Sequence, residues 1–240
     1  MQYQLSRARP YNDHGLMAAL SVSAKAAKEG VPASTNKRTL IQVRMASVEM
    51  LVGGPYGDKS YGHAALRVTT AELDRVFDYG RYGNAWGVGK SEGEGILRIW
   101  SNFNAYIAEE NALGRVTTGF VYDTTEEGAR KILEFFDNMT AGKPVISNRP
   151  IRKVVKVDTY YALGPNCTTL SLAGIKTVFP DIDRNWSAFQ KGRGLGVMEK
   201  AAVTAKGWPN HIFMPADLQV MLESSSAKKP KKINKYGVKQ

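Results

Sequence analysis

The sequence predicts an α+β protein. Segments with strand patterns and segments with helix patterns follow one another without the regular strand–helix–strand alternation that builds parallel sheets. The chain has 240 residues, of which 43% are hydrophobic and 23% charged, which is typical of a globular protein that buries a core. No apolar run approaches the length of a membrane-spanning helix, so we expect no transmembrane segment.

Three elements are expected before the first glycine-rich turn. Residues 12–29 have the pattern of an amphipathic, alanine-rich helix, and residues 31–38 have the composition of a linker. The segment Thr39–Val52 is rich in Val, Ile, Leu and Met. It predicts one long strand or a helix-to-strand transition, which the turn at residues 53–58 ends.

Two neighbouring strands are expected next. Gly62–Thr69 predicts the first, and Val76–Tyr79 predicts the second. Successive side chains of a strand point to opposite faces of the sheet. One face of the first strand therefore carries its aliphatic residues, and the opposite face carries His63, Ala65 and Arg67.

The middle of the chain combines a glycine-rich segment with two regular elements. Residues 80–95 contain six glycines and predict a long mobile loop, of the kind that often borders a binding site. A strand at Gly95–Trp100 and a helix from a Ser101 cap through Leu113 are expected to follow. Four aromatic residues either line a groove or anchor the core here, namely Tyr79, Tyr82, Trp86 and Trp100.

The second half of the chain predicts further strands and helices. The strongest helix is Thr124–Thr140, where Thr124 and Glu127 form a capping box ahead of an apolar face. The other expected elements are strands at Arg115–Tyr122 and Ile151–Asp158 and helices at Cys167–Phe179 and Pro215–Leu222.

The net charge of +11 is concentrated at the two ends of the chain. Residues 1–44 carry seven cations against two acids, residues 227–240 carry six cations and no acid, and residues 45–226 carry twenty of each. We therefore expect an N-terminal helix and linker (1–38), a folded domain (39–226) and a disordered basic tail (227–240). Because the folded part is neutral, no specific nucleic-acid binding is expected. The tail is either a solvated arm or an electrostatic tether to an anionic surface.

Cys167 is the only cysteine, so an internal disulfide is excluded. It follows Gly164, Pro165 and Asn166, which interrupt regular structure, and an apolar helical pattern begins directly after it. This context places Cys167 at or near a helix N-terminus. Free N–H groups and the helix dipole stabilise a thiolate at that position, and the same N–H groups are suited to hold an oxyanion. The alternative is a small buried residue in a core helix.

A nucleophilic thiol needs a base, and His63 is the best placed of the three histidines. It opens a strand directly after a glycine-rich turn, and its small neighbours leave room for a substrate. His14 is expected in the first helix, and His211 in a turn after Trp208. The alternative is that His63 is a structural residue, since most isolated histidines are.

Asp78 is the candidate for orienting the imidazole. It lies in the strand expected after that of His63, and adjacent antiparallel strands bring such side chains within reach of each other. The alternative is that Asp78 simply pairs with Arg75 or Arg81.

The order of His63, Asp78 and Cys167 resembles the circularly permuted branch of the NlpC-type papain-like superfamily. In that branch the His strand precedes the Cys helix, as it does here. The segments that carry the resemblance are Tyr61–Val68, Phe77–Gly83 and Asn166–Leu170.

The resemblance implies a papain-like fold, in which an antiparallel sheet packs against helices and the Cys begins a helix. It implies that Cys167 is the nucleophile, His63 the base and Asp78 the orienting group, although the third position varies in such enzymes. Candidates for oxyanion or substrate contacts are Tyr161, Asn166 and Tyr56.

Within the superfamily, the chain resembles cell-wall-targeting effectors of type VI secretion. The implied reaction is cleavage of an amide in the peptide stem of bacterial peptidoglycan. The implied partners are an immunity protein and a secretion-system carrier. The N-terminus lacks the apolar region of a secretory signal, so we expect synthesis in the cytoplasm and delivery into the periplasm of a target cell.

Other functions stay open at this point. Permuted relatives suggest a lipid acyl hydrolase or acyltransferase, and a protein-directed protease or deamidase is a further possibility. A non-enzymatic binding module would use the basic tail. The glycines lack nucleotide-binding spacing and the Cys and His residues lack zinc-binding spacing, so no cofactor or metal is expected.

Overall fold

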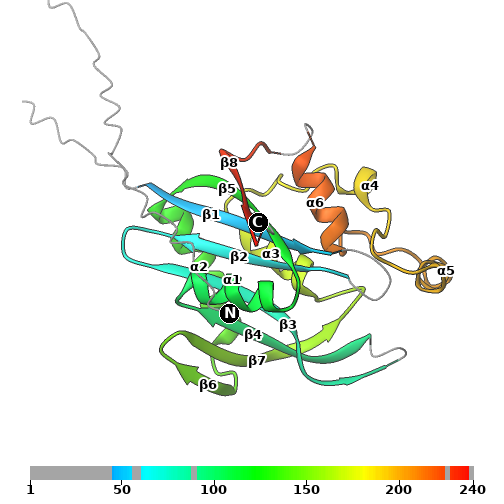
Figure 1. The fold of residues 1–240 in the computed structure, drawn as a ribbon, viewed down its shortest axis with the longest axis horizontal. Coiled ribbons are helices and arrows are strands. Elements are labelled where there is room, and N and C mark those ends of the chain that lie inside the picture. The colour runs from blue at the N-terminus through cyan, green and yellow to red at the C-terminus, as the bar shows by residue number, and fades with distance from the viewer. Residues whose placement is uncertain (1–44, 56–60, 88–90, 225–227, 238–240) are drawn as a thin grey trace, which may run out of the picture. The chain divides into compact units, whose positions relative to one another are not determined.

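The computed structural model describes residues 45–55, 61–87, 91–224 and 228–237. The helix expected at 12–29, the linker at 31–38 and the candidate residues Tyr56 and His14 lie outside the described residues. The described part is α+β, as predicted, with helices packed against an antiparallel sheet (Figure 1).

One sheet organises the described residues. Its strands are β1 (Met45–Gly54), β2 (His63–Thr69), β3 (Asp74–Trp86), β4 (Glu92–Trp100), β5 (Val116–Thr125), β6 (Val145–Arg149), β7 (Arg152–Tyr161) and β8 (Lys232–Tyr236). The helices are α1 (Phe103–Ala112), α2 (Glu126–Thr140), α3 (Cys167–Lys176), α4 (Trp186–Phe189), α5 (Val197–Lys206) and α6 (Pro215–Glu223). The strands lie in the order β6-β7-β4-β3-β2-β1-β5-β8, and every adjacent pair is antiparallel.

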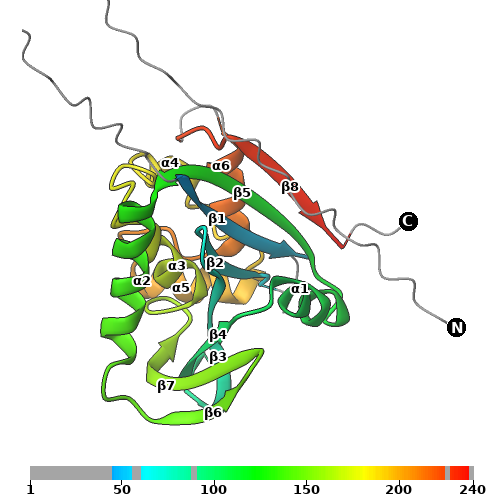
Figure 2. The ribbon, with the colours of Figure 1, turned by 90° about the vertical axis from the view of Figure 1, so that its left-hand side faces the viewer.

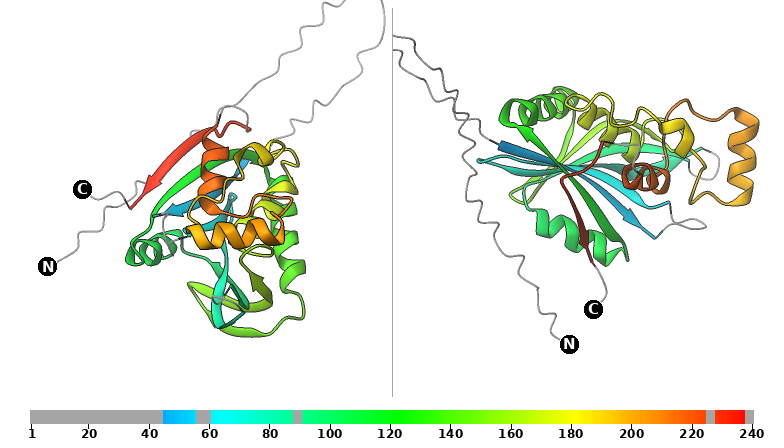
Figure 3. Two further views of the ribbon diagram at one scale, coloured as in Figure 1. Left: turned by 90° about the vertical axis from the view of Figure 1, so that its right-hand side faces the viewer. Right: turned by 90° about the horizontal axis from the view of Figure 1, so that it is seen from above.

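Both faces of the sheet are covered. Helices α2, α3 and α6 pack on one face and α1 packs on the other, as two views turned from the first make clear (Figure 2 and Figure 3). The central strand β1 therefore buries side chains in both directions, with Met50 in the larger core cluster and Leu51 in the smaller one. In the larger cluster the rings of Phe77 and Phe136 stack with centroids 3.9 Å apart.

Most predicted elements are confirmed, with differences at their ends. The strand expected to begin at Gly62 is β2, and the helix expected over 124–140 is α2. The N-cap of α2 is Thr125, not Thr124, because the Thr125 hydroxyl accepts the N–H of Gly128 at 3.1 Å. The cap of α1 is likewise Asn102 rather than Ser101.

The expectation of a mobile loop over 80–95 is wrong for its described part, residues 80–87 and 91–95. Strand β3 continues to Trp86 and β4 already begins at Glu92, so most of this segment belongs to paired strands. The glycines allow close packing there: a methyl group on Gly95 would collide with the Tyr79 hydroxyl, and one on Gly93 would collide with the Arg81 stem. Glycine in a strand marks such close approaches as well as loops.

The expectation of a disordered tail over 227–240 is also wrong for its described part. Lys232–Tyr236 forms β8, which pairs with β5 at one edge of the sheet. The Tyr236 hydroxyl and the Asn234 amide donate to the buried Glu49 carboxylate at 2.8 and 2.9 Å. Polar partners buried in the folded domain therefore hold this lysine-rich segment, which its composition did not predict.

Elements β6, α4 and α5 were not predicted. Strand β6 shows little alternation of apolar and polar residues, and its Val145 and Ile146 side chains are exposed. Its pairing with β7, and not a sequence pattern, therefore defines it as a strand. Among the described residues, no helix is long and apolar enough to cross a membrane.

Candidate active site

Cys167 is the first residue of α3, as predicted. Asn166 caps the helix: its Oδ1 accepts the N–H of Thr169 at 3.0 Å, and the Thr169 hydroxyl accepts the N–H of Asn166 at 2.9 Å. The Asn166 amide also donates to the carbonyls of Ala162 and Phe213, at 2.8 and 3.1 Å. The Asn166 side chain is thus fully engaged in holding the turn before Cys167, so it is not free to bind an oxyanion as suggested.

His63 is the first residue of β2, at the end where β2 and β3 separate. The pairing of β1 with β2 extends to His63, but the pairing of β2 with β3 stops at Leu66 and Phe77. This separation lets the buried His63 ring reach Asp78 of β3 on one side and Cys167 of α3 on the other.

Asp78 is completely buried and accepts hydrogen bonds from four side chains. Its Oδ1 lies 2.6 Å from Nε2 of His63 and accepts the Tyr82 hydroxyl at 2.8 Å. Its Oδ2 accepts Nε of Arg98 at 2.8 Å and Nε1 of Trp100 at 3.3 Å. A carboxylate saturated in this way stays ionised and fixed in place.

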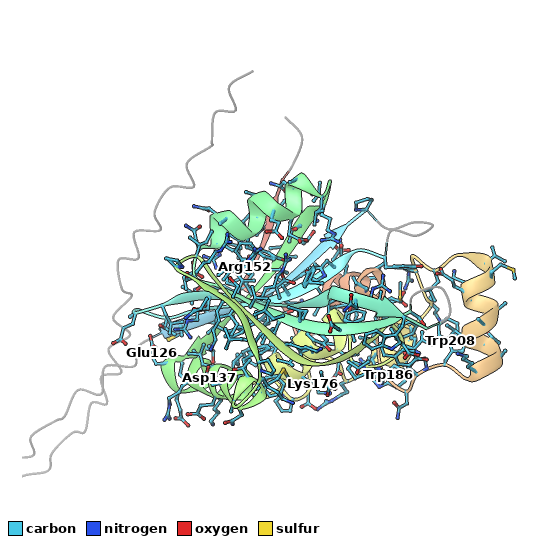
Figure 4. All side chains as sticks on the ribbon, turned by 90° about the horizontal axis from the view of Figure 1, so that it is seen from below. Glu126, Asp137, Arg152, Lys176, Trp186 and Trp208 are labelled. Carbon is cyan, nitrogen blue, oxygen red and sulfur yellow. The ribbon has the colours of Figure 1, made fainter. Side chains whose placement is uncertain are left out.

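Arg98, rather than Arg75 or Arg81, is the ionic partner of Asp78. The two residues are directly opposite each other in the β3–β4 ladder. The Arg98 guanidinium lies 3.7 Å above the Tyr82 ring and is bonded to Glu109 of α1. Arg152 of β7, labelled in Figure 4, donates to the same glutamate at 2.9 Å.

The charges of His63, Asp78 and Cys167 are mutually dependent. Burial lowers the pKa of His63, but the charge and hydrogen bond of Asp78 outweigh it and raise that pKa to about 10. Burial raises the pKa of Asp78, but His63 and Arg98 bring it far below its usual range. Burial also raises the pKa of Cys167, but its hydrogen bond with His63 and the His63 charge produce a net lowering. The site therefore favours a thiolate beside an imidazolium.

Tyr160, not Tyr161, faces the thiol. The Tyr160 hydroxyl lies 3.9 Å from Sγ of Cys167, to which it donates. Tyr161 lies against Gly164 in the following turn. Adjacent residues of a strand point to opposite faces, so only one of the two tyrosines can face α3.

Arg98 and Tyr160 were not identified as site residues from the sequence, and neither was the role of Tyr82 as a donor to Asp78. Tyr82 and Trp100 were candidates for a groove or the core. Trp100 does lie in the smaller core cluster, and both side chains also donate to Asp78. The alternation of side chains in β7 places Tyr160 and Tyr161 on opposite faces, but the sequence does not say which of these faces meets Cys167. Within the described part of the chain, the His211 side chain forms a hydrogen bond only with its neighbour Asn210, and burial lowers its pKa.

Comparisons with protein-family models, with curated proteins and with solved structures give no match for this chain.

Proposed function

We propose that this protein is a cysteine hydrolase that cleaves an amide through Cys167, His63 and Asp78. One observation carries the proposal: a buried thiol at a helix N-terminus lies beside a histidine that a buried aspartate holds at 2.6 Å, and that histidine lowers the pKa of the thiol. This arrangement supports nucleophilic catalysis, because the base is oriented and the thiol is activated. It is also consistent with the permuted papain-like architecture that the resemblance implies.

In the proposed reaction the two ring nitrogens of His63 have different tasks. Nε2 faces Asp78, which leaves Nδ1 for the thiol and the substrate. The thiolate attacks the amide carbonyl, a C–S bond forms, and the carbonyl π electrons move to oxygen. Nδ1 of the imidazolium then protonates the leaving nitrogen, the C–N bond breaks, and a thioester remains. His63 next takes a proton from water as the water oxygen forms a C–O bond with the thioester carbonyl. The C–S bond then breaks, which releases the carboxylic acid and restores the thiolate beside the imidazolium.

Two donors are available for the tetrahedral oxyanion. They are the backbone N–H of Cys167, at the N-terminus of α3, and the Tyr160 hydroxyl, which lies 3.9 Å from Sγ. A carbonyl oxygen of the substrate that accepted from both donors would be stabilised as it becomes the oxyanion.

The proposed substrate is the peptide stem of peptidoglycan, and the proposed role is that of an antibacterial type VI effector. Both follow from the resemblance. Such an effector acts in the periplasm of the target cell and is neutralised by an immunity protein.

The test is digestion of purified peptidoglycan, with mass spectrometry of the released fragments. Parallel reactions contain phospholipid vesicles or an unfolded protein, which represent the lipid and protein alternatives. We expect new amine and carboxyl ends in the peptide stem with the wild type and with His211→Gln, but none with Cys167→Ala or His63→Gln. Cleavage that persists in Cys167→Ala would overturn the proposal.

A further inference from the structure

Arg81 projects from the same face of the sheet as the candidate nucleophile. It lies two residues after Tyr79 in β3, and the β3–β4 pairing is regular from Tyr79 opposite Leu97 to Arg81 opposite Gly95. Side chains two apart in a strand share a face. Tyr79 belongs to the core cluster that contains Cys167, and its ring lies 5.6 Å from that of Tyr160.

The Arg81 stem crosses β4 at a glycine. The space where Gly93 would carry a Cβ is filled by Cγ and Cδ of Arg81. Gly93 is paired on its other side with Tyr160 of β7. The stem therefore runs from β3 across β4 toward the tyrosine whose hydroxyl lies 3.9 Å from the Cys167 sulfur. Burial raises the pKa of Tyr160 well above its usual value, and the positive charge of Arg81 opposes part of that rise, which is consistent with a guanidinium near this hydroxyl.

The Arg81 guanidinium has no partner of its own in the part of the chain that the structure describes. It forms neither a hydrogen bond nor an ion pair there, and the residue is exposed. By contrast, Arg98 and Arg152 on the two adjoining strands both bond to Glu109. The nearby Asp158 carboxylate accepts the N–H of Thr159 instead.

We propose that Arg81 binds a carboxylate group of the substrate close to the scissile carbonyl. A guanidinium offers two parallel N–H donors that match a carboxylate, and this one combines a confined stem with an unpaired head beside the site. The substrate class is therefore an acyl compound with a carboxylate near the bond that is cut. This inference rests on the proposed function, because it assumes that Cys167 is the nucleophile.

Two alkylating reagents test the inference without a known substrate. Iodoacetate and iodoacetamide both react with the thiolate as an S–C bond forms, the C–I bond breaks and iodide leaves. They differ in carrying a carboxylate or a neutral amide. The ratio of their rates at Cys167 thus measures how strongly the site attracts a carboxylate.

We expect Arg81→Gln to lower the ratio of the iodoacetate rate to the iodoacetamide rate by about three- to tenfold, as estimated for a unit charge several ångströms away. The iodoacetamide rate should stay unchanged. Arg81→Lys should retain part of the preference. Arg75→Gln is the matched control, since Arg75 is an exposed arginine at the opposite end of β3, and it should leave the ratio unchanged.

The other outcomes distinguish failure of the Arg81 proposal from failure of the proposed function. An unchanged ratio in Arg81→Gln would overturn the role of Arg81 while leaving the hydrolase proposal intact. An equal fall in both rates would also overturn it, since it would mean that Arg81 supports the reactivity of the thiol rather than binding a carboxylate. A wild-type Cys167 that reacts with neither reagent would overturn the proposed function itself.

Discussion

Oδ1 of Asp78 lies 2.6 Å from Nε2 of His63, in a position closed to solvent. This contact orients the ring so that Nδ1 is left for Cys167. Because Asp78 also bonds to Arg98, Tyr82 and Trp100, the carboxylate has little freedom to rotate. The position of the proposed base is thus determined by side chains from β3 and β4 as well as by its own strand.

The first prediction concerns the pH dependence of thiol alkylation. In the wild type the pKa of Cys167 is lowered and that of His63 is raised to about 10, so the ion pair exists between the two values. We expect the iodoacetamide rate to rise at a pH well below the ordinary thiol pKa of about 8.5. In His63→Gln the rise should move up toward or beyond that value. His211→Gln is the control, and identical profiles for all three proteins would refute the Cys–His pair.

The second prediction concerns stability and Asp78. Asp78→Asn leaves the buried His63 without its anion and leaves Arg98 with Glu109 as its anionic partner, so we expect it to lower the free energy of unfolding by about 3 to 5 kcal/mol at neutral pH. The pKa of Asp78 is depressed in the folded protein, so its contribution is complete above about pH 4 and is lost as the pH falls further. Urea unfolding at several pH values measures this. The exposed Asp137→Asn variant, whose position Figure 4 labels on the surface of α2, should unfold like the wild type.

The third prediction concerns the Tyr160 hydroxyl. If it helps to hold the oxyanion, Tyr160→Phe should lower kcat by up to about a hundredfold with little change in KM. Tyr161→Phe serves as the control, because its side chain lies against Gly164. Steady-state kinetics on the cleaved stem peptide provide the measurement. Equal effects of the two substitutions would argue against a specific role of Tyr160.

The fourth prediction concerns the cap that positions Cys167. Asn166→Ala removes an N-cap and leaves the buried Phe213 carbonyl without this donor, so we expect a loss of about 2 to 4 kcal/mol in unfolding free energy. Asn166→Asp retains the acceptor for the Thr169 N–H and should cost less at neutral pH. Urea unfolding with parallel alkylation rates checks both effects. A fully stable Asn166→Ala protein would contradict the role of the cap.

The fifth prediction concerns the C-terminal strand. Tyr236→Phe removes one of the hydrogen bonds to the buried Glu49 carboxylate, so it should lower the unfolding free energy by about 1 to 3 kcal/mol. Lys232→Ala, at the exposed first position of the same strand, should have no comparable effect. A Tyr236→Phe protein as stable as the wild type would indicate that β8 contributes little to the fold.

Local patterns predicted several elements because their causes lie within a few residues. Gly164, Pro165 and Asn166 end one element and cap the next, which places Cys167 at a helix start. Alternation in Gly62–Thr69 likewise predicts β2 with His63 at its first position. The class α+β follows from the order of such segments.

Register and burial are decided by the tertiary structure. Three arginines were available to Asp78, and only the pairing of β3 with β4 brings Arg98 opposite it. Two adjacent tyrosines precede Cys167, and the face of β7 that meets α3 selects Tyr160. Neither choice leaves a mark in the nearby sequence, because a one-residue shift of register would reverse it.

In the glycine-rich segment and the lysine-rich tail, too, the structure that composition predicts differs from the one that tertiary contacts produce. Their composition is that of loops and solvated arms, yet Gly93 and Gly95 accommodate neighbouring side chains, and Asn234 and Tyr236 bond to Glu49. The sequence by itself determined the local elements and the residues able to perform chemistry. Only the tertiary structure decided which of them meet, because contacts between distant residues depend on how the whole core packs and not on local preference.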